Sequence, residues 1–319
     1  IQVYSLEAGL VAVSSDFYAR YPTDARTCLA MIKDSSGILA KLLDGGKSMV
    51  AGRLSGAFRN IGNDKIANNI LATMKSAGYD VRETDPFNEK TELELSSREV
   101  SPYVNRIKIM WEQMRGEVIK YFPQAPKEIL KVNDYLKQVQ ENYKSDAYHS
   151  LSIEGYRVTP ELIEKVASGD WDPNKSTEDR QQKDAMAARG YFQAFQAVKA
   201  SIKSVLEGEN PGEVVDNDHS SWYRELFAPS VGIGLAKASD LAGYRNGPVY
   251  IKGAMHTPPR HEAVRDTMPV FFDLLKEEPE VSVRVVLGHF IFVYIHPYFD
   301  GNGRIARFLM NVMLASGNY

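Results

Sequence analysis

The sequence is short of the features that mark secreted, membrane or nucleic-acid-binding proteins. Cys28 is its only cysteine, so the chain can form no internal disulfide and no thiolate metal cluster. Its formal net charge of -3 lacks the basic excess that is typical of nucleic-acid-binding domains. The longest apolar run, VVLGHFIFVYI at 285–295, is too short to span a bilayer. Because residues 1–10 also lack a basic start and a long apolar stretch, we expect no signal peptide, no membrane partner and a cytoplasmic location.

What the sequence does contain is helical periodicity, with apolar residues three and four positions apart. We expect a mainly α protein with two domains. The first, at 1–95, is a helical domain and a candidate for target or partner recognition. The second covers 96–319, and the polar, proline-bounded segment 80–102 joins the two. The predicted helices cover 22–46, 63–79, 103–122, 127–155, 159–171, 177–208, 261–278, 281–295 and 302–316, with a loop at 208–221.

One segment breaks the helical pattern. GYRNGPVYIKGAMHTPP, at 243–259, places a Val-Tyr-Ile run between glycines and prolines. This arrangement predicts a short strand or hairpin.

The segment HPYFDGNGRIAR, at 296–307, has the most informative composition. Pro297 disfavours helix at the residue before it, so the preceding helix should end close to His296. Gly301 and Gly303 allow a tight turn whose backbone can approach a ligand closely. A new helix then begins, and its unpaired N–H groups and positive dipole end predict a site for phosphate.

The charged residues of this segment add the remaining parts of a reaction site. Arg304 and Arg307 lie three positions apart on one helical turn, so both can converge on one polyphosphate. Asp300 beside a phosphate site would repel the ligand unless a cation intervened, which suggests Mg²⁺ ligation. His296 has an ordinary pKa of about 6.5, so it is largely neutral at pH 7 and can accept a proton. Together these residues suit nucleophilic attack on a nucleotide phosphate.

HPYFDGNGRIAR resembles the signature of the Fic family, His-Pro-Phe-x-(Asp/Glu)-Gly-Asn-Gly-Arg-x-x-Arg, with Tyr298 in place of the usual Phe. The segment YRNGPVYIKGAMHTPP resembles the flap hairpin of that family, and the helix pair at 261–295 resembles its core helices. The likeness covers roughly residues 100–319. It implies a Fic-type helical bundle with a small β-hairpin flap near 246–259.

The resemblance also implies an activity, namely transfer of AMP from ATP to a hydroxyl side chain of a target protein. This makes the chain a nucleotidyltransferase with ATP as substrate, Mg²⁺ as cofactor and a protein partner that offers an accessible Tyr, Ser or Thr hydroxyl. Self-modification is among the outcomes that it allows. In this interpretation His296 is the catalytic base and Asp300 holds Mg²⁺ between the α- and β-phosphates.

The remaining roles follow from the same resemblance. The turn of Gly301, Asn302 and Gly303 forms the anion hole, with Asn302 on the α-phosphate. Arg304 neutralises the departing pyrophosphate, and Arg307 holds the γ-phosphate. The flap aligns the target by strand pairing through Val249, Tyr250, Ile251, Lys252 and Gly253.

A second element, SLSIEG at 150–155, gains meaning from this resemblance. Ser150 and Glu154 lie four positions apart on one helical face, and Gly155 can end that helix. The string resembles the inhibitory motif of the family, (Ser/Thr)-x-x-x-Glu-(Gly/Asn), on a helix near 140–156. We expect Glu154 to pair with Arg307 and so occupy the cation meant for the γ-phosphate.

Other functions remain open at this point. One is removal of AMP, with Glu154 orienting a water, and another is transfer of a different phosphate-containing group. From another class, the chain could be a DNA-binding regulator or toxin–antitoxin component that uses nucleotide only as a conformational ligand. A helix-turn-helix at 53–79 would then present Arg53, Arg59 and Lys65 to DNA.

Several further residues have structural interpretations. We expect His289 to be a core histidine rather than a metal ligand, since no third ligand is in view. We expect His256 and His261 to lie on the surface, and Trp111 and Trp222 to be core aromatics.

Overall fold

The computed structural model describes residues 4–32, 35–87, 101–127, 129–171, 179–236, 243–251 and 253–319. All of their regular secondary structure is helical, which confirms the predicted mainly α fold. The chain divides into two units, Ile1–Gln113 and Met114–Tyr319. The boundary expected between residues 95 and 96 stays a prediction, and residues 88–100 of the expected linker lie outside the described residues.

The first unit is built from short helices. They are α1 (Leu6–Ala12), α2 (Ser15–Arg20), α3 (Pro22–Ala30), α4 (Ser36–Leu43), α5 (Ser48–Asn60), α6 (Asp64–Ser76) and the first part of α7 (Pro102–Tyr121). The single helix expected at 22–46 is therefore two helices. Ser35 lies between the two helices, and its hydroxyl accepts a hydrogen bond from the Asn69 side chain at 2.5 Å.

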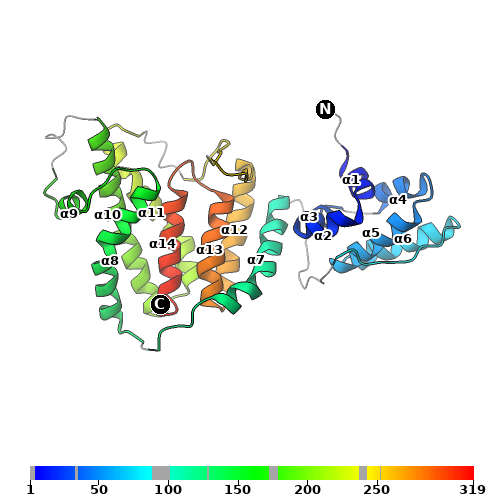
Figure 1. The fold of residues 1–319 in the computed structure, drawn as a ribbon, viewed down its shortest axis with the longest axis horizontal. Helices are drawn as coiled ribbons and strands as arrows, with labels where there is room; N and C mark the ends of the chain where they lie inside the picture. The colour runs from blue at the N-terminus through cyan, green and yellow to red at the C-terminus, as the bar shows by residue number, and fades with distance from the viewer. Residues whose placement is uncertain are drawn as a thin grey trace. The chain divides into compact units, whose positions relative to one another are not determined.

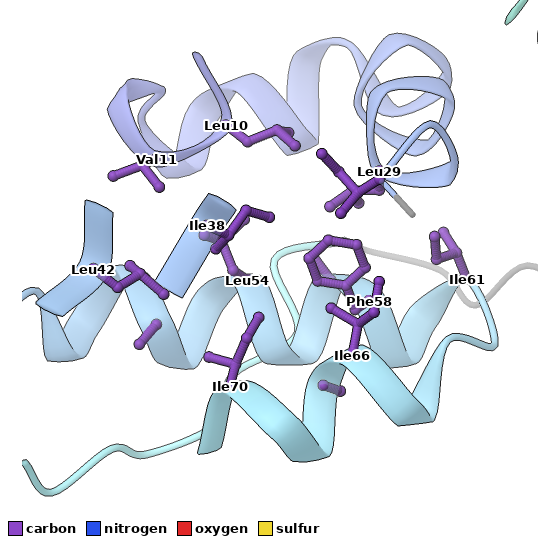
Figure 2. Packing of buried hydrophobic residues seen from close by; sticks show 14 of the residues in the cluster. Leu10, Val11, Leu29, Ile38, Leu42, Leu54, Phe58, Ile61, Ile66 and Ile70 are labelled. Carbon is purple, nitrogen blue, oxygen red and sulfur yellow. The ribbon is translucent and has the colours of Figure 1, made fainter. Parts of the chain in front are cut away.

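The core of this unit lies between α5, α6 and the helices that precede them (Figure 2). Leu54 and Phe58 of α5 are fully buried, and so is Ile70 of α6. Figure 2 shows these side chains facing Leu10 and Leu29 across the core. Burial of side chains of this size stabilises the fold by about 1.5–3 kcal/mol each.

Two of the basic residues that a DNA-binding helix-turn-helix would present make contacts inside the first unit. Arg53 donates a hydrogen bond to the Val13 carbonyl at 2.6 Å. Arg59 pairs with Glu83 at 2.7 Å and with Asp64 at 3.0 Å. These cations are already neutralised or hydrogen-bonded, which weakens the case for a basic DNA-binding surface.

The second unit is a bundle of longer helices (Figure 1). After the end of α7 come α8 (Val132–Ile153), α9 (Pro160–Ala167), α10 (Asp179–Leu206), α11 (Pro211–Gly232), α12 (His261–Glu277), α13 (Val281–Ile295) and α14 (Asn302–Ala315). Helices α10 and α11 pack along each other, as do α13 and α14. Helix α14 also packs against α8, α10 and α11, so it lies at the centre of the bundle. No helix in the described part of the chain is both long and apolar enough to cross a membrane.

The loop predicted at 208–221 is wrong, because most of this segment is the start of α11. Asn210 caps the helix by accepting hydrogen bonds from the backbone N–H groups of Gly212 and Glu213. Pro211 occupies the first turn, where its missing N–H is no loss. The cap outweighs the local Gly, Asp and Asn content, and the buried Trp222 supplies part of the packing.

The segment 243–259, which was expected to form a short strand or hairpin and to contain the flap, has no strand in its described residues. Its chain turns at Gly253, which has a φ of 78°, and Ala254 N donates to Ile251 O across the turn at 3.1 Å. Tyr250 is 80% exposed. Lys252 lies outside the described residues. The flap is therefore an irregular loop with an exposed edge.

Candidate active site

The candidate site is the loop between α13 and α14, whose shape is set by its own backbone and one amide. His296 ends α13 in the left-handed region with a φ of 54°, and Gly301 precedes α14 with a φ of 82°. The Asn302 side chain accepts a hydrogen bond from Tyr298 N at 2.9 Å and donates one to Tyr298 O at 2.8 Å. These paired bonds close the turn directly before α14. The first N–H groups of that helix, which have no partner within it, therefore follow the turn.

His296 has the properties of a neutral base. Its Nδ1 lies 3.3 Å from the carbonyl of Val293. A carbonyl can only accept, so Nδ1 carries the proton and Nε2 keeps its lone pair. Burial lowers the pKa of His296 from its ordinary value, and the hydrogen bond to Val293 opposes this shift. The imidazole is therefore neutral at pH 7 and able to take a proton.

Asp300 and Arg304 form a pair beside this loop. Asp300 Oδ1 accepts hydrogen bonds from Gly301 N at 2.6 Å and from Arg304 Nη2 at 3.1 Å. Arg304 is 1% exposed, and its guanidinium lies between the rings of Tyr156 and Phe227, at 5.3 and 5.1 Å from their centroids. These two cation–π contacts help to hold the side chain in place.

Arg307, one turn along α14, is held from α8. Its Nε donates to Ser150 Oγ at 2.7 Å, and its Nη2 donates to Ser150 O at 3.2 Å. The same Nη2 forms an ion pair with Glu154 Oε1 at 2.7 Å. Gly155 follows with a φ of 84°, and Tyr156 N donates to Leu151 O at 3.1 Å, so the helix ends where the glycine predicts.

The Glu154 carboxylate also lies against the first turn of α14. A side chain at Gly303 would overlap Glu154 Oε1 and would approach Arg307 Nη1 to 3.2 Å. Glycine at this position leaves room for an oxygen ligand near the helix start, where an anion is favoured. A cleft of about 580 Å³ opens beside it and is lined by Glu154, Tyr156 and Asp300, among others.

The donor set fits Mg²⁺ only if a ligand supplies further oxygens. No group of three potential metal-binding side chains occurs in the part of the chain that the structure describes. The Asp300 side chain is 60% exposed and offers hard carboxylate oxygens. Mg²⁺ in phosphate sites typically takes one or two carboxylates plus phosphates and waters, so one aspartate is enough.

The structure brings most of the predicted residues together. His296, Asp300, Arg304 and Arg307 share one loop and the turn that follows it, and Glu154 reaches them from α8. Both polar atoms of the Asn302 side chain bond to Tyr298, so its contact with the α-phosphate stays a prediction. The roles predicted for the flap residues stay predictions too.

Some contacts were not anticipated from the sequence. His256 was expected on the surface, but it is half-buried and its Nε2 bonds to Tyr294 O at 2.9 Å. Arg245 contacts the loop, and Tyr156 and Phe227 contact Arg304 in α14. Of these three residues, only Arg245 could have been suspected from the sequence, because it lies in the segment that resembles the family's flap. His289 is half-buried, and Trp111 and Trp222 are core residues as predicted.

The site combines a helix start that favours anions, a neutral imidazole, two arginines and one exposed carboxylate, and this arrangement suits a phosphate ligand. Residues 219–314 match the family model described as Fic/DOC family. This matched segment contains most of α11 and all of α12, α13 and α14, so this part of the chain is similar to the Fic/DOC family.

Curated relatives match a little over half of the chain. "Protein adenylyltransferase Fic" from Nematostella vectensis is 27% identical over 188 residues, which are 57% of this chain and 40% of the relative. The protein of the same name from Drosophila willistoni is 28% identical, over 60% of this chain and 36% of the relative. A probable protein adenylyltransferase from Aquifex aeolicus is 28% identical, over 54% and 47%. The chain spans less than half the length of each.

Among solved structures, a Fic family protein from Desulfovibrio desulfuricans G20 aligns with a TM-score of 0.42 and 21% identity. The alignment covers 67% of this chain and 58% of that one.

Proposed function

We propose that this protein is an autoinhibited protein adenylyltransferase, which transfers AMP from ATP to a hydroxyl side chain of a target protein. The names of its relatives support the activity. The observation that carries the proposal is the Glu154 carboxylate, which pairs with Arg307 and lies against Gly303 at the start of α14. An anionic group of the protein thus occupies the place that best suits an anionic phosphate.

The reaction that fits the site is a substitution at the α-phosphorus of ATP. The target hydroxyl oxygen bonds to that phosphorus, and the bond from phosphorus to the oxygen that bridges to the β-phosphate breaks. Pyrophosphate leaves with the electron pair of that bond. The hydroxyl proton passes to Nε2 of His296, the nitrogen left unprotonated by the hydrogen bond to Val293.

The remaining residues bind and orient. The N–H groups at the start of α14, beyond Gly301, supply the anion hole, and Arg307 holds the γ-phosphate once Glu154 has left it. Arg304 offsets charge on the leaving pyrophosphate from its place beside Asp300. Asp300 would hold Mg²⁺, which neutralises phosphate charge when bound. Val249, Tyr250 and Ile251 of the flap would align the target segment.

Inhibition follows from competition for one cation. Arg307 has its Nε and Nη2 donors engaged by Ser150 and Glu154, so the γ-phosphate of ATP must displace the carboxylate to reach it. The pair is partly exposed, at 18% for Arg307 and 25% for Glu154. A phosphate can therefore approach it from solvent.

Labelled ATP tests the proposal. Glu154→Gly protein is incubated with Mg²⁺ and a cell lysate as the source of targets, and label is counted above that taken up by the lysate alone, whose own kinases transfer the γ-phosphate. ATP labelled at the α-phosphate should then label protein, and ATP labelled at the γ-phosphate should add no label. Glu154→Gly/His296→Ala protein should give no label. Label from the γ position would replace the proposal with phosphoryl transfer. No label from either position would favour a nucleotide-responsive regulator.

Removal of AMP is tested with the same reagents. A target labelled by the Glu154→Gly protein is isolated and incubated with the wild-type chain and Mg²⁺. Under the proposal, the label stays on the target. Loss of label that requires Glu154 would instead assign hydrolysis to this chain.

A further inference from the structure

Arg245 stands out among the residues that the proposed mechanism does not use. It lies at the start of the flap, and it is 1% exposed. Its Nε donates to His296 O at 2.7 Å, and its Nη1 donates to Gly247 O at 3.0 Å. Its Nη2 donates to Pro259 O at 2.5 Å and to Ile295 O at 3.4 Å. One guanidinium thus joins both ends of the flap to the end of α13.

The end of α13 needs such donors, because the last carbonyls of a helix have no partner within it. Phe292 O accepts from His296 N at 2.9 Å, and Val293 O accepts from His296 Nδ1 at 3.3 Å. The next carbonyl, that of Tyr294, bonds to Nε2 of His256 from the flap at 2.9 Å.

Arg245 supplies the rest. Its guanidinium bonds to the carbonyls of Ile295 and His296, and its backbone N–H donates to Pro297 O at 2.9 Å. Six consecutive carbonyls, from 292 to 297, therefore each have a donor, and three of the six use Arg245. A buried cation at this place also suits the negative end of the helix dipole.

The backbone of His296 depends on this support. Its φ of 54° lies in the left-handed region, where non-glycine residues are uncommon. Such a conformation persists when the surrounding structure holds it in place. The bond from Arg245 Nε to the His296 carbonyl fixes the peptide that follows the base, and with it the direction of the imidazole.

We propose that Arg245 is a positioning residue that caps α13, holds His296 in its left-handed conformation and ties both ends of the flap to it. The base and the segment that docks the target then form one unit. The inference rests on the proposed function and deepens it, because Arg245 acts through His296 and the flap rather than on ATP.

The first test does not depend on activity. Hydrogen exchange is followed by mass spectrometry in full-length wild-type, Arg245→Met and Arg260→Met proteins, with thermal unfolding as the check on folding. Arg260 is an exposed arginine directly after the flap, so its replacement is a matched control. Peptides from 243–260 and 292–300 should exchange faster in Arg245→Met and unchanged in Arg260→Met. Unchanged exchange in a folded Arg245→Met protein would overturn the proposal.

The second test separates positioning from general destabilisation. In the Glu154→Gly background, Arg245→Met should lower kcat for AMP transfer by about 100-fold, the scale expected for a misplaced catalytic group. The KM for Mg-ATP should change little, because Arg307 is untouched. A rise in the KM for Mg-ATP with an unchanged kcat would contradict the proposal that Arg245 acts through His296.

Two further variants should show smaller effects on hydrogen exchange and kcat than Arg245→Met. Arg245→Lys keeps the charge but not the fork of donors, so exchange and kcat should lie between those of wild type and Arg245→Met. It also carries the test if Arg245→Met does not fold. His256→Phe keeps the ring against Tyr294 and loses one bond, so its effect should be smaller than that of Arg245→Met. Equal effects from His256→Phe and Arg245→Met would contradict the assignment of the main positioning role to Arg245.

If the Glu154→Gly protein itself transfers no AMP, the proposed function fails. The hydrogen-exchange experiment would still decide whether Arg245 holds the flap and the end of α13.

Discussion

The two ends of the segment 296–307 are held in different ways. At the upstream end, Arg245 and His256 bond to backbone carbonyls, and Arg245 is 1% exposed. At the downstream end, Glu154 pairs with the side chain of Arg307, which is 18% exposed. A phosphate can replace a carboxylate on an arginine, but it cannot replace a donor on a carbonyl. We therefore expect the upstream end to stay in place and the downstream end to exchange partners.

Replacing the base at the fixed end should have the largest effect. In the Glu154→Gly background, His296→Ala should lower the rate of AMP transfer by about 10²–10⁴-fold, the usual contribution of a positioned base. The initial rate with α-labelled ATP measures this. The KM for Mg-ATP should stay within a few-fold of the parent value, and a loss expressed only in KM would contradict the role of His296.

The pH dependence of the rate of AMP transfer also tests the role of His296 as the base. Burial lowers the pKa of His296, and the nearby Arg245 and His256 lower it further, while Glu154 raises it. Because the neutral form is the base, the rate should be flat near pH 7 and fall about tenfold per pH unit below that lowered pKa. Removing Glu154 should move this acid limb to lower pH. The limb should persist in His256→Phe, and its loss there would contradict its assignment to His296.

At the exchangeable end, Ser150→Ala should weaken the hold on Arg307 and raise activity. It removes the acceptor of one charge-assisted hydrogen bond, whose typical value of about 1.5–3 kcal/mol gives an upper bound near 10–100-fold. We expect a smaller rise, about fivefold, since Glu154 remains. Ser152→Ala, an exposed change on the same helix, serves as the control. An unchanged rate in Ser150→Ala would show that Ser150 does not restrain Arg307.

The smallest expected effect concerns Tyr298. Its hydroxyl is buried and has no hydrogen-bond partner among the described groups, while its ring stacks on Tyr223 with centroids 3.9 Å apart. Tyr298→Phe should therefore leave the free energy of unfolding unchanged or raise it by less than about 1 kcal/mol. Denaturant unfolding measures this. A loss of more than about 1 kcal/mol would reveal a partner for the hydroxyl.

The sequence predicted the parts of this site that depend on local rules. Pro297 and Gly301 mark the helix end and the turn, and the spacing of Ser150 and Glu154 placed them on one face. Helix α11 was missed because its Gly, Asp and Asn content favours a loop, although the pair Asn210 and Pro211 carried a cap signal.

Contacts across long stretches of chain could not be predicted in this way. Arg245 lies 51 positions from His296, and its partners are backbone carbonyls, which leave no side-chain pattern in the sequence. The packing of Tyr156 and Phe227 around Arg304 likewise requires three separate elements to be in place. These contacts follow from the packing of the flap against α13 and of Tyr156 and α11 against α14, rather than from the spacing of residues.

The central claim is that Glu154 and ATP compete for Arg307, and the rate of AMP transfer tests it most directly. Initial rates with α-labelled ATP are compared for wild type, Glu154→Gly, Glu154→Gln and Glu141→Gln, an exposed control on the same helix. The account predicts rates at least about tenfold above wild type in both Glu154 variants, which is about 1.4 kcal/mol of released competition, and no change in Glu141→Gln. Equal rates in all four proteins would contradict it.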